Sequence, residues 1–194
     1  MMTIENKVEE IISLYIKYGD SDYIGEPVSQ IEHMYQCAEL AMEANADEEL
    51  ILAAFFHDIG HLYEFAFPDE SIISMDGFGV FDHERIGANY LASIGFSETI
   101  SKLVASHVEA KRYLAYKFPS YLKELSKASL KTLVFQGGKM SVEEASEFEN
   151  DKLFEQYITL RIWDEKAKQT NKTIGDLKIF KDLMISHLTK NQSS

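Results

Sequence analysis

Residues 47–61 read DEELILAAFFHDIGH, and this stretch decides how the rest of the chain is interpreted. Asp47 is a typical N-cap residue before an acidic first turn, and the apolar run behind it predicts a helix that stops at Gly60. The pair His57-Asp58 closes this apolar helix. Ionisable side chains in such a place are costly to bury alone, and a metal ion shared between them provides compensation.

The adjacency of these two residues bears on how many ions they serve. Neighbouring side chains on a helix point about 100° apart, so His57 and Asp58 cannot coordinate a single ion in the same way. His57 can bind one ion while Asp58, with two carboxylate oxygens, bridges to a second ion about 3.5–4 Å away. The dipeptide therefore indicates a pair of metal ions.

Further histidines flank the pair. The first five of the six histidines are separated by 24, 4, 22 and 24 residues: His33, His57, His61, His83 and His107. Four of them fall on four different expected helices or helix ends, which is how helix bundles place inward-pointing metal ligands. A hydrogen-bonded core or surface residue is the simpler interpretation of any single histidine, and we keep it for His187. The set, together with a late aspartate, predicts a metal site.

Helical periodicity runs through nearly the whole chain, and no stretch shows convincing alternation of apolar and polar residues. The expected helices cover residues 5–18, 28–45, 47–59, 83–94, 97–117, 119–126, 128–136, 142–149, 151–169 and 174–189. Residues 19–27 are rich in turn residues, and residues 62–81 have no period. A loop as long as the second is typical of a lid or a site wall. We expect an all-α fold with one helical domain over residues 1–194 and the metal centre in its middle.

Local signals support several of these boundaries. Ser141 and Glu144 have the spacing of a capping box, and Asp82 stands immediately before the helix of His83. Gly95 and the pair Gly137-Gly138 stand where helices should end.

Composition bounds the class of protein. Apolar residues make up 45% of the 194 residues and aromatic residues 12%, which excludes a disordered chain. The formal net charge of −13 disfavours nucleic acid and anionic membranes as partners, but a small anionic substrate remains compatible because metal ions add local positive charge. The single cysteine, Cys37, fits a reducing compartment and is expected as a small buried side chain, and Trp163 is expected in the core. Without a signal-peptide pattern or a membrane-spanning apolar run, we expect a cytoplasmic protein.

The order His33, His57-Asp58 and a late aspartate, Asp164, resembles the HD-domain superfamily, and His83 and His107 match the two additional histidines of its dinuclear members. A longer series of segments resembles one subgroup, the mixed-valence di-iron oxygenases that cleave carbon–phosphorus bonds: YIGEPVSQIEHMYQCA (23–38), HDIGH (57–61), GFGVFDHERIGANYL (77–91), SHVEAKRYL (106–114), SKASLKTLVFQGG (126–138) and LRIWDEKAKQT (160–170).

The resemblance implies the cofactors and their ligands. One iron would be bound by His33, His57, Asp58 and Asp164, and the other by Asp58, His83 and His107. Four imidazoles and two carboxylates suit iron or manganese, and the resemblance selects two iron ions in the Fe(II)/Fe(III) state with O2 as co-substrate.

The resemblance also implies substrate contacts. Tyr23 would occupy an iron position until substrate displaces it, and Glu26 would meet the substrate ammonium. His61, Ser129 and Thr132 would contact the substrate. Without the resemblance, each residue has a simpler interpretation. Tyr23 would be a loop aromatic packed on the core, and Glu26 a solvated loop carboxylate. His61 would be a histidine at a helix C-terminus, and Ser129 and Thr132 polar groups on a helix surface.

Two basic residues are supported by spacing as well. Lys111 follows His107 by four residues, so both project from one helix face, and a cation beside a dimetal site suits an anionic phosphonate. Arg161 precedes Asp164 by three residues, and a bidentate guanidinium suits phosphonate oxygens. The simpler interpretation of each is a surface salt bridge.

Three functions are compatible with these residues. The first is an oxygenase that cleaves the C–P bond of a small 1-hydroxy-2-aminoalkylphosphonate with O2, giving phosphate and an amino acid, as the resemblance implies. The second is an HD-type phosphohydrolase acting on a nucleotide or phosphomonoester. Tyr23 with Glu26 in YIGEP, and His61 where hydrolytic members often have lysine, favour the oxygenase. The third is a non-catalytic metal-binding sensor, in which Lys111 and Arg161 would lack a purpose.

Overall fold

The computed structural model describes residues 2–23, 25–67, 74–77 and 79–192. Within these ranges the regular structure is eleven helices, and the all-α class predicted from periodicity is confirmed. The helices are α1 (Ile4–Tyr18), α2 (Gln30–Glu43), α3 (Glu48–Phe56), α4 (Ile59–Ala66), α5 (His83–Ile94), α6 (Glu98–Lys117), α7 (Tyr121–Glu124), α8 (Lys127–Phe135), α9 (Val142–Glu149), α10 (Phe154–Lys166) and α11 (Lys178–Gln192). None of these helices is long and apolar enough to cross a membrane.

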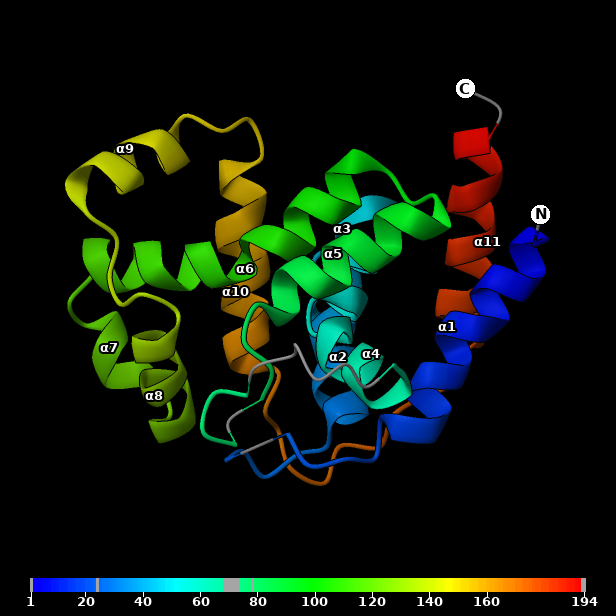
Figure 1. The fold of residues 1–194 in the computed structure, drawn as a ribbon, viewed down its shortest axis with the longest axis horizontal. Helices are drawn as coiled ribbons and strands as arrows, with labels where there is room; N and C mark the ends of the chain where they lie inside the picture. The colour runs from blue at the N-terminus through cyan, green and yellow to red at the C-terminus, as the bar shows by residue number, and fades with distance from the viewer. Residues whose placement is uncertain (1, 24, 68–73, 78, 193–194) are drawn as a thin grey trace.

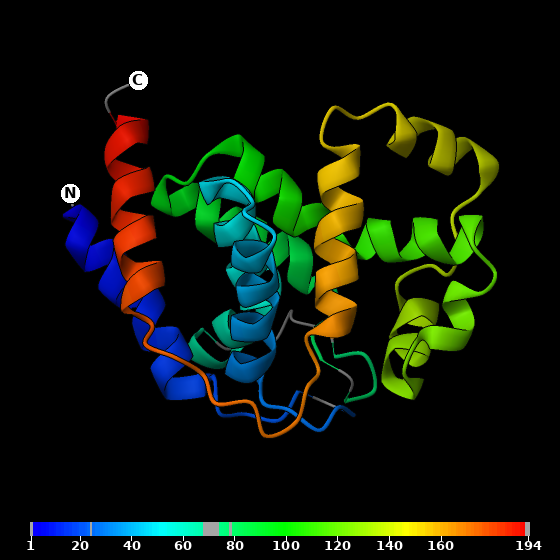
Figure 2. The same ribbon diagram turned by 180° about the vertical axis from the view of Figure 1, so that it is seen from behind.

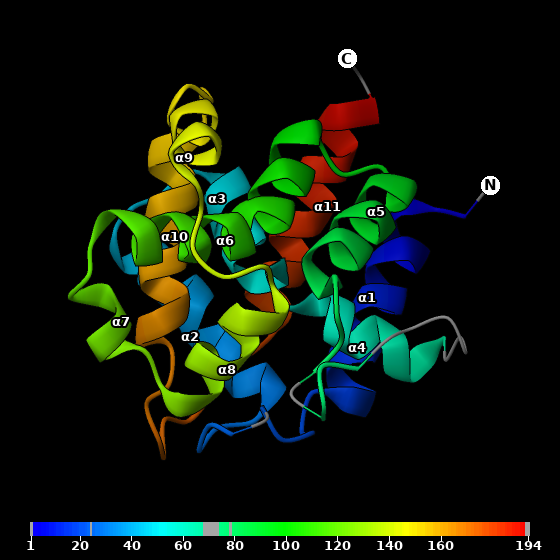
Figure 3. The ribbon, with the colours of Figure 1, turned by 60° about the vertical axis from the view of Figure 1, so that its left-hand side comes forward.

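The long helix α6 connects the two ends of the molecule. It packs against α5, α3 and α10, while α2 packs against both α3 and α10 (Figures 1 and 2). The terminal helices α1 and α11 lie side by side at one end, and α7, α8 and α9 lie at the other end (Figures 1 and 3). Helices distant in sequence thereby surround a common centre, which is where the predicted ligands lie.

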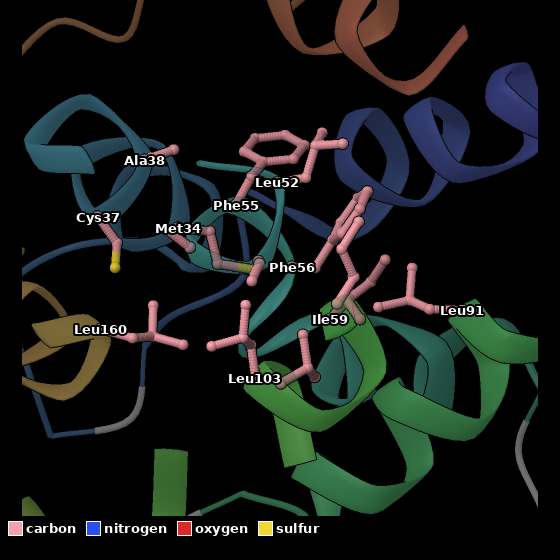
Figure 4. Close-up of a cluster of buried hydrophobic side chains, with 14 of the residues drawn as sticks. Met34, Cys37, Ala38, Leu52, Phe55, Phe56, Ile59, Leu91, Leu103 and Leu160 are labelled. Atoms are coloured by element: carbon pink, nitrogen blue, oxygen red, sulfur yellow. The ribbon is translucent and has the colours of Figure 1, made fainter. Parts of the chain in front are cut away.

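The core is formed by the inward faces of these helices (Figure 4). The ring of Phe55 on α3 is stacked between Tyr15 of α1, at 4.3 Å between ring centroids, and Phe180 of α11, at 4.0 Å. Cys37 is fully buried, as predicted, whereas Trp163 is only partly buried against the core. The stacked rings fix the terminal helices on α3, the helix that leads into the metal site.

The helix expected over 47–59 is two helices. α3 ends at Phe56, the backbone turns at His57 and Asp58, and α4 begins at Ile59 and continues through the start of the expected loop 62–81. Gly60 is therefore not a C-cap, and that prediction is wrong. A Cβ at Gly60 would lie 2.0 Å from the backbone oxygen of His83, so glycine is needed here because α4 closely approaches α5. Part of the expected loop, residues 68–73 and 78, lies outside the described residues.

Other boundaries follow their signals more closely. The Ser141 and Glu144 capping box is present, and Gly95 ends α5 with φ 112°. Gly137 and Gly138 follow α8 with φ of 92° and 71°. Asp82 precedes α5 but makes no side-chain cap and has a left-handed backbone.

The last expected helix begins at Lys178 rather than at residue 174. His187, on this helix, is a buried residue whose Nε2 accepts from the Ser97 amide at 3.3 Å, so its interpretation as a hydrogen-bonded non-ligand holds.

Candidate metal centre and substrate pocket

Asp58 stands at the break between α3 and α4, and its two carboxylate oxygens face different pairs of histidines. Oδ2 lies 3.4 Å from Nε2 of both His33 and His57. Oδ1 lies 3.2 Å from Nε2 of His83 and 3.4 Å from Nε2 of His107. This is the arrangement expected of a carboxylate that bridges two metal ions.

The side of the centre formed by His33 and His57 includes a second carboxylate. Nε2 of His33 and Nε2 of His57 are 2.9 Å apart, and Asp164 Oδ1 lies 3.3 Å from the first and 3.8 Å from the second. Ligand atoms about 2.1 Å from one ion, at right angles to each other, are about 3.0 Å apart. The spacing of these side chains from α2, α3 and α10 therefore fits a shared ion.

The four histidines share a hydrogen-bonding pattern that fixes their tautomers. Each Nδ1–H donates to a backbone carbonyl: His33 to Ala167 at 2.9 Å, His57 to Ala54 at 2.8 Å, His83 to Val80 at 3.1 Å and His107 to Val104 at 2.8 Å. With that proton on Nδ1, each neutral imidazole directs a lone pair from Nε2. The lone pairs meet in pairs, 2.9 Å and 3.1 Å apart, so a cation is needed between them.

The buried negative charge of the site also indicates bound cations. Asp58 and Asp164 are almost completely buried, and among the described residues Asp164 Oδ1 has no hydrogen-bond partner. Burial alone would raise the pKa of Asp58, but His57 and the other histidines hold it well below its usual range. Burial likewise opposes ionisation of Asp164, and the Arg161 guanidinium keeps its pKa low. Two buried carboxylates and four imidazole nitrogens form a donor set that fits two divalent or trivalent ions.

A small cavity adjoins this centre. Its walls include Asp58, His83, His107 and Asp164, the expected resting-state ligand Tyr23, and every substrate contact expected from the sequence: Glu26, His61, Lys111, Ser129, Thr132 and Arg161. The enclosed part of the cavity has a volume of about 60 Å³, which is enough for about four to six water molecules. The cavity therefore fits a small molecule.

Lys111 is a buried cation with neutral partners. It is 3% exposed, and its Nζ donates to Thr132 Oγ1 at 2.7 Å and to Gln136 Oε1 at 3.0 Å. Burial, and then the nearby Arg161, lower the pKa of Lys111 to about 7. No carboxylate in the described ranges forms an ion pair with it, so it is not a surface salt bridge, and an anion in the cavity would be its natural partner.

Arg161 is also buried, but its donors are already engaged. It forms ion pairs with Asp164 and Glu165, and its Nε donates to the Tyr121 hydroxyl at 2.8 Å. The guanidinium thus orients the metal-facing Asp164. A bidentate contact from Arg161 to a phosphonate stays a prediction.

The turn that carries Tyr23 and Glu26 covers the side of the site near His33. The Tyr23 ring is stacked on the His33 imidazole with 4.0 Å between centroids, and burial beside Asp58 and Asp164 raises the pKa of its hydroxyl well above the ordinary value. Ligation of iron by Tyr23 stays a prediction. The Glu26 carboxylate accepts hydrogen bonds from the Ser126 hydroxyl and from Lys168, 3.1 Å away, so it is not a solvated loop carboxylate.

His61 lines the cavity on the side of His83. Its ring is stacked on His83 with 4.1 Å between centroids, and its Nδ1 accepts from the Val80 amide at 3.2 Å. The proton of neutral His61 is therefore on Nε2, where it can be donated. Gly79 makes room for this ring, because a Cβ there would lie 2.7 Å from His61 Cε1.

Sequence analysis missed three residues of this neighbourhood. Lys168 contacts Glu26, and Gln136 contacts Lys111. Gln30 lines the cavity, is 5% exposed, and has an Oε1 atom without a partner in the described part of the chain. Helical spacing was an available signal, because Gln30 precedes His33 by three residues and Lys168 follows Asp164 by four.

The fold and the site together define a helical metalloprotein in which one aspartate is shared by two pairs of histidines. The family model for the HD domain matches residues 31–136, and the chain belongs to this family. That range contains five of the six candidate ligands, and Asp164 lies beyond it.

Three relatives place the chain within the family. An uncharacterised protein of Acanthamoeba polyphaga mimivirus is 43% identical over 194 residues, which is 100% of this chain and 87% of the relative. The glycine-betaine-forming 1-hydroxy-2-(trimethylamino)ethylphosphonate dioxygenase of Leisingera caerulea is 40% identical over 88% of this chain and 85% of the relative. The hydroxymethylphosphonate dioxygenase of Gimesia maris is 34% identical over 89% of this chain and 83% of the relative. The chain therefore groups with the oxygenases of the HD-domain family.

Proposed function

We propose that this chain is a mixed-valence di-iron dioxygenase that cleaves the C–P bond of a small 1-hydroxyphosphonate, with 2-amino-1-hydroxyethylphosphonate as substrate and glycine and phosphate as products. Two relatives named as phosphonate dioxygenases support the reaction type. The observation that carries the assignment is the buried Lys111 ammonium, which lies on the wall of the same cavity as the shared Asp58. The overall reaction balances, because oxidation of the substrate C–H and C–P bonds supplies the electrons that reduce O2.

The residues at the centre fit two iron ions. His33, His57, Asp58 and Asp164 would hold one ion, and Asp58, His83 and His107 would hold the other. The irons, when bound, supply the redox chemistry with dioxygen, and the protein supplies orientation, charge and exclusion of water.

The lining of the cavity provides groups for both charges of the proposed substrate. Lys111 and the hydroxyl groups of Ser129 and Thr132 provide donors for the phosphonate oxygens. Glu26, which is joined to Ser129 through Lys168, provides a carboxylate for the ammonium group. Tyr23, stacked on His33, excludes water from that side of the centre.

The cavity beside the metal centre suits a small phosphorus-containing substrate, because its enclosed part has a volume of about 60 Å³. A phosphomonoester as small as the proposed substrate would fit, so the decisive difference between the two functions is the requirement for oxygen.

Phosphate release from 2-amino-1-hydroxyethylphosphonate tests the proposal. With iron-loaded protein in air-saturated buffer, we expect one phosphate and one glycine per O2 consumed. Under strict anaerobiosis, phosphate release should stop. Equal release of phosphate with and without oxygen would assign the chain to the hydrolases.

A further inference from the structure

We propose that Lys168 is a second cation for the anionic group of the substrate, and that Glu26 holds it in place until the substrate arrives. The Lys168 Nζ atom lies 2.9 Å from Glu165 Oε1, 3.1 Å from Glu26 Oε1 and 3.2 Å from Ser129 Oγ. The inference rests on the proposed function, because it takes the anionic group to be a phosphonate.

Ser129 is the point where Lys168 reaches the cavity. Ser129 and Thr132 lie one turn apart on α8, and both line the cavity. Lys168, just beyond the end of α10, donates to Ser129, while Lys111 on α6 donates to Thr132 at 2.7 Å. An anion that accepts hydrogen bonds from both hydroxyls therefore comes within reach of two ammonium groups.

The charge of a phosphonate calls for a second cation. A phosphoryl group carries about −1.5 to −2 at neutral pH, so Lys111 alone neutralises only part of it. The Arg161 guanidinium is engaged by Asp164, Glu165 and Tyr121. Lys168 has the flexible stem and three donors that allow an ammonium to change partners without moving the backbone.

Glu26 is the partner that Lys168 must leave. The two side chains are only 8% and 12% exposed, so their ion pair is largely desolvated. Once Lys168 turns to a phosphonate, the Glu26 carboxylate keeps the Ser126 hydroxyl but loses its cation, which is unfavourable at a buried site. An ammonium group on the substrate restores the balance. This exchange of partners makes the site select substrates that carry both charges.

A fixed structural ion pair is the competing explanation. Glu26 and Lys168 are 142 residues apart, and their contact also joins the turn before α2 to the end of α10. A purely structural role predicts that removing either charge lowers stability and weakens every ligand alike. Exchange predicts opposite effects of one substitution on two ligands.

Glu26→Gln is the decisive variant. We expect dissociation constants, measured without oxygen so that no turnover occurs, to move in opposite directions. Hydroxymethylphosphonate, which has no ammonium, should bind about 3- to 10-fold more tightly, because Lys168 then has Glu165 as its one remaining carboxylate partner among the described residues. 2-Amino-1-hydroxyethylphosphonate should bind about 10-fold more weakly, because its ammonium loses the Glu26 carboxylate. Unchanged or weaker binding of hydroxymethylphosphonate would overturn the inference.

Lys168→Gln tests the other partner. It should weaken both ligands about 10- to 100-fold and raise KM more than it lowers kcat, and Lys168→Arg should restore most of the binding. Lys172→Gln is a matched control, because Lys172 forms a 2.9 Å ion pair with Glu39 away from the cavity, and it should change neither affinity. Loss of binding for the amino ligand alone would show that Lys168 acts only through Glu26 and would refute the phosphonate contact.

Two further outcomes keep this inference separate from the proposed function. If Lys168→Gln fails to fold, the sign of the Glu26→Gln effect still decides the question. If the wild-type protein binds both phosphonates but releases no phosphate in oxygen, the proposed reaction fails while the exchange of partners is still measured.

Discussion

Replacing Asp58 with alanine should remove both metal ions from the protein. Each carboxylate oxygen faces one pair of histidine nitrogens, at 3.4 Å on one side and at 3.2 Å and 3.4 Å on the other. The change leaves His83 and His107 as two neutral ligands without an anion, and it leaves Asp164 as the remaining carboxylate for two cations. Breaking a buried charge pair costs about 3–5 kcal/mol, so affinity at each position should fall about 10²- to 10⁴-fold.

The assay is iron per chain after iron loading and desalting, with folding followed by circular dichroism. Wild type should retain close to two irons and Asp58→Ala close to none. His33→Ala removes a ligand from one position and should keep close to one. Asp82→Asn, in an exposed salt bridge with Arg85 at the start of α5, is the matched aspartate control and should keep both. An Asp58→Ala protein that retains one or two irons would refute the bridging role.

Three other substitutions or conditions follow from the same geometry. Lys111→Met should lower kcat/KM for hydroxyphosphonates about 30- to 1,000-fold, because a bound anion loses about 2–4 kcal/mol of charge-assisted contact; steady-state kinetics measure this, and a change under threefold would contradict it. In the substrate-free protein the pKa of Lys111 is lowered from 10.5 to about 7. Between pH 7 and pH 10.5 the Lys111 side chain therefore binds more protons in the unfolded chain than in the folded protein. Its contribution to the free energy of unfolding rises with pH over this range. Denaturant unfolding should therefore show the stability advantage of Lys111→Met over wild type shrinking by about 2 kcal/mol between pH 7 and pH 9. A constant difference would argue against a lysine whose pKa is lowered in the folded protein. Gly60→Ala should cost about 3 kcal/mol or more and release iron from the His83 side, because the added Cβ would lie 2.0 Å from the His83 carbonyl oxygen; unchanged unfolding and iron content would show that α4 and α5 can separate freely.

Local sequence patterns were sufficient for the helical class and for selecting candidate ligand residues that the structure brings together at one centre. The 3.6-residue period marks helices whether or not their partners are known, and the spacing of His33, His57, His83 and His107 places one histidine on each of several helices or helix ends. The adjacency of His57 and Asp58 required different directions for the two side chains, and the structure has Asp58 facing both histidine pairs. These features depend on the chain within a few residues of each position.

The break between α3 and α4 depends on packing instead. An apolar run followed by glycine is typical of a helix end, and the chain alone does not reveal that Gly60 lies against the backbone of His83. A close approach between two helices is a property of their packing, so the glycine was misread as a cap.

The partners of the charged residues in the cavity were also decided by tertiary structure. Glu26 and Lys168 are 142 residues apart, and Lys111 and Thr132 are 21 apart, so no local pattern links either pair. The sequence alone determined which side chains can bind metal and anion, because that is a property of each residue type and its helical spacing. Only the folded chain decided which of these charges are buried together and which carboxylate each cation contacts, since burial and distance arise when separate helices pack.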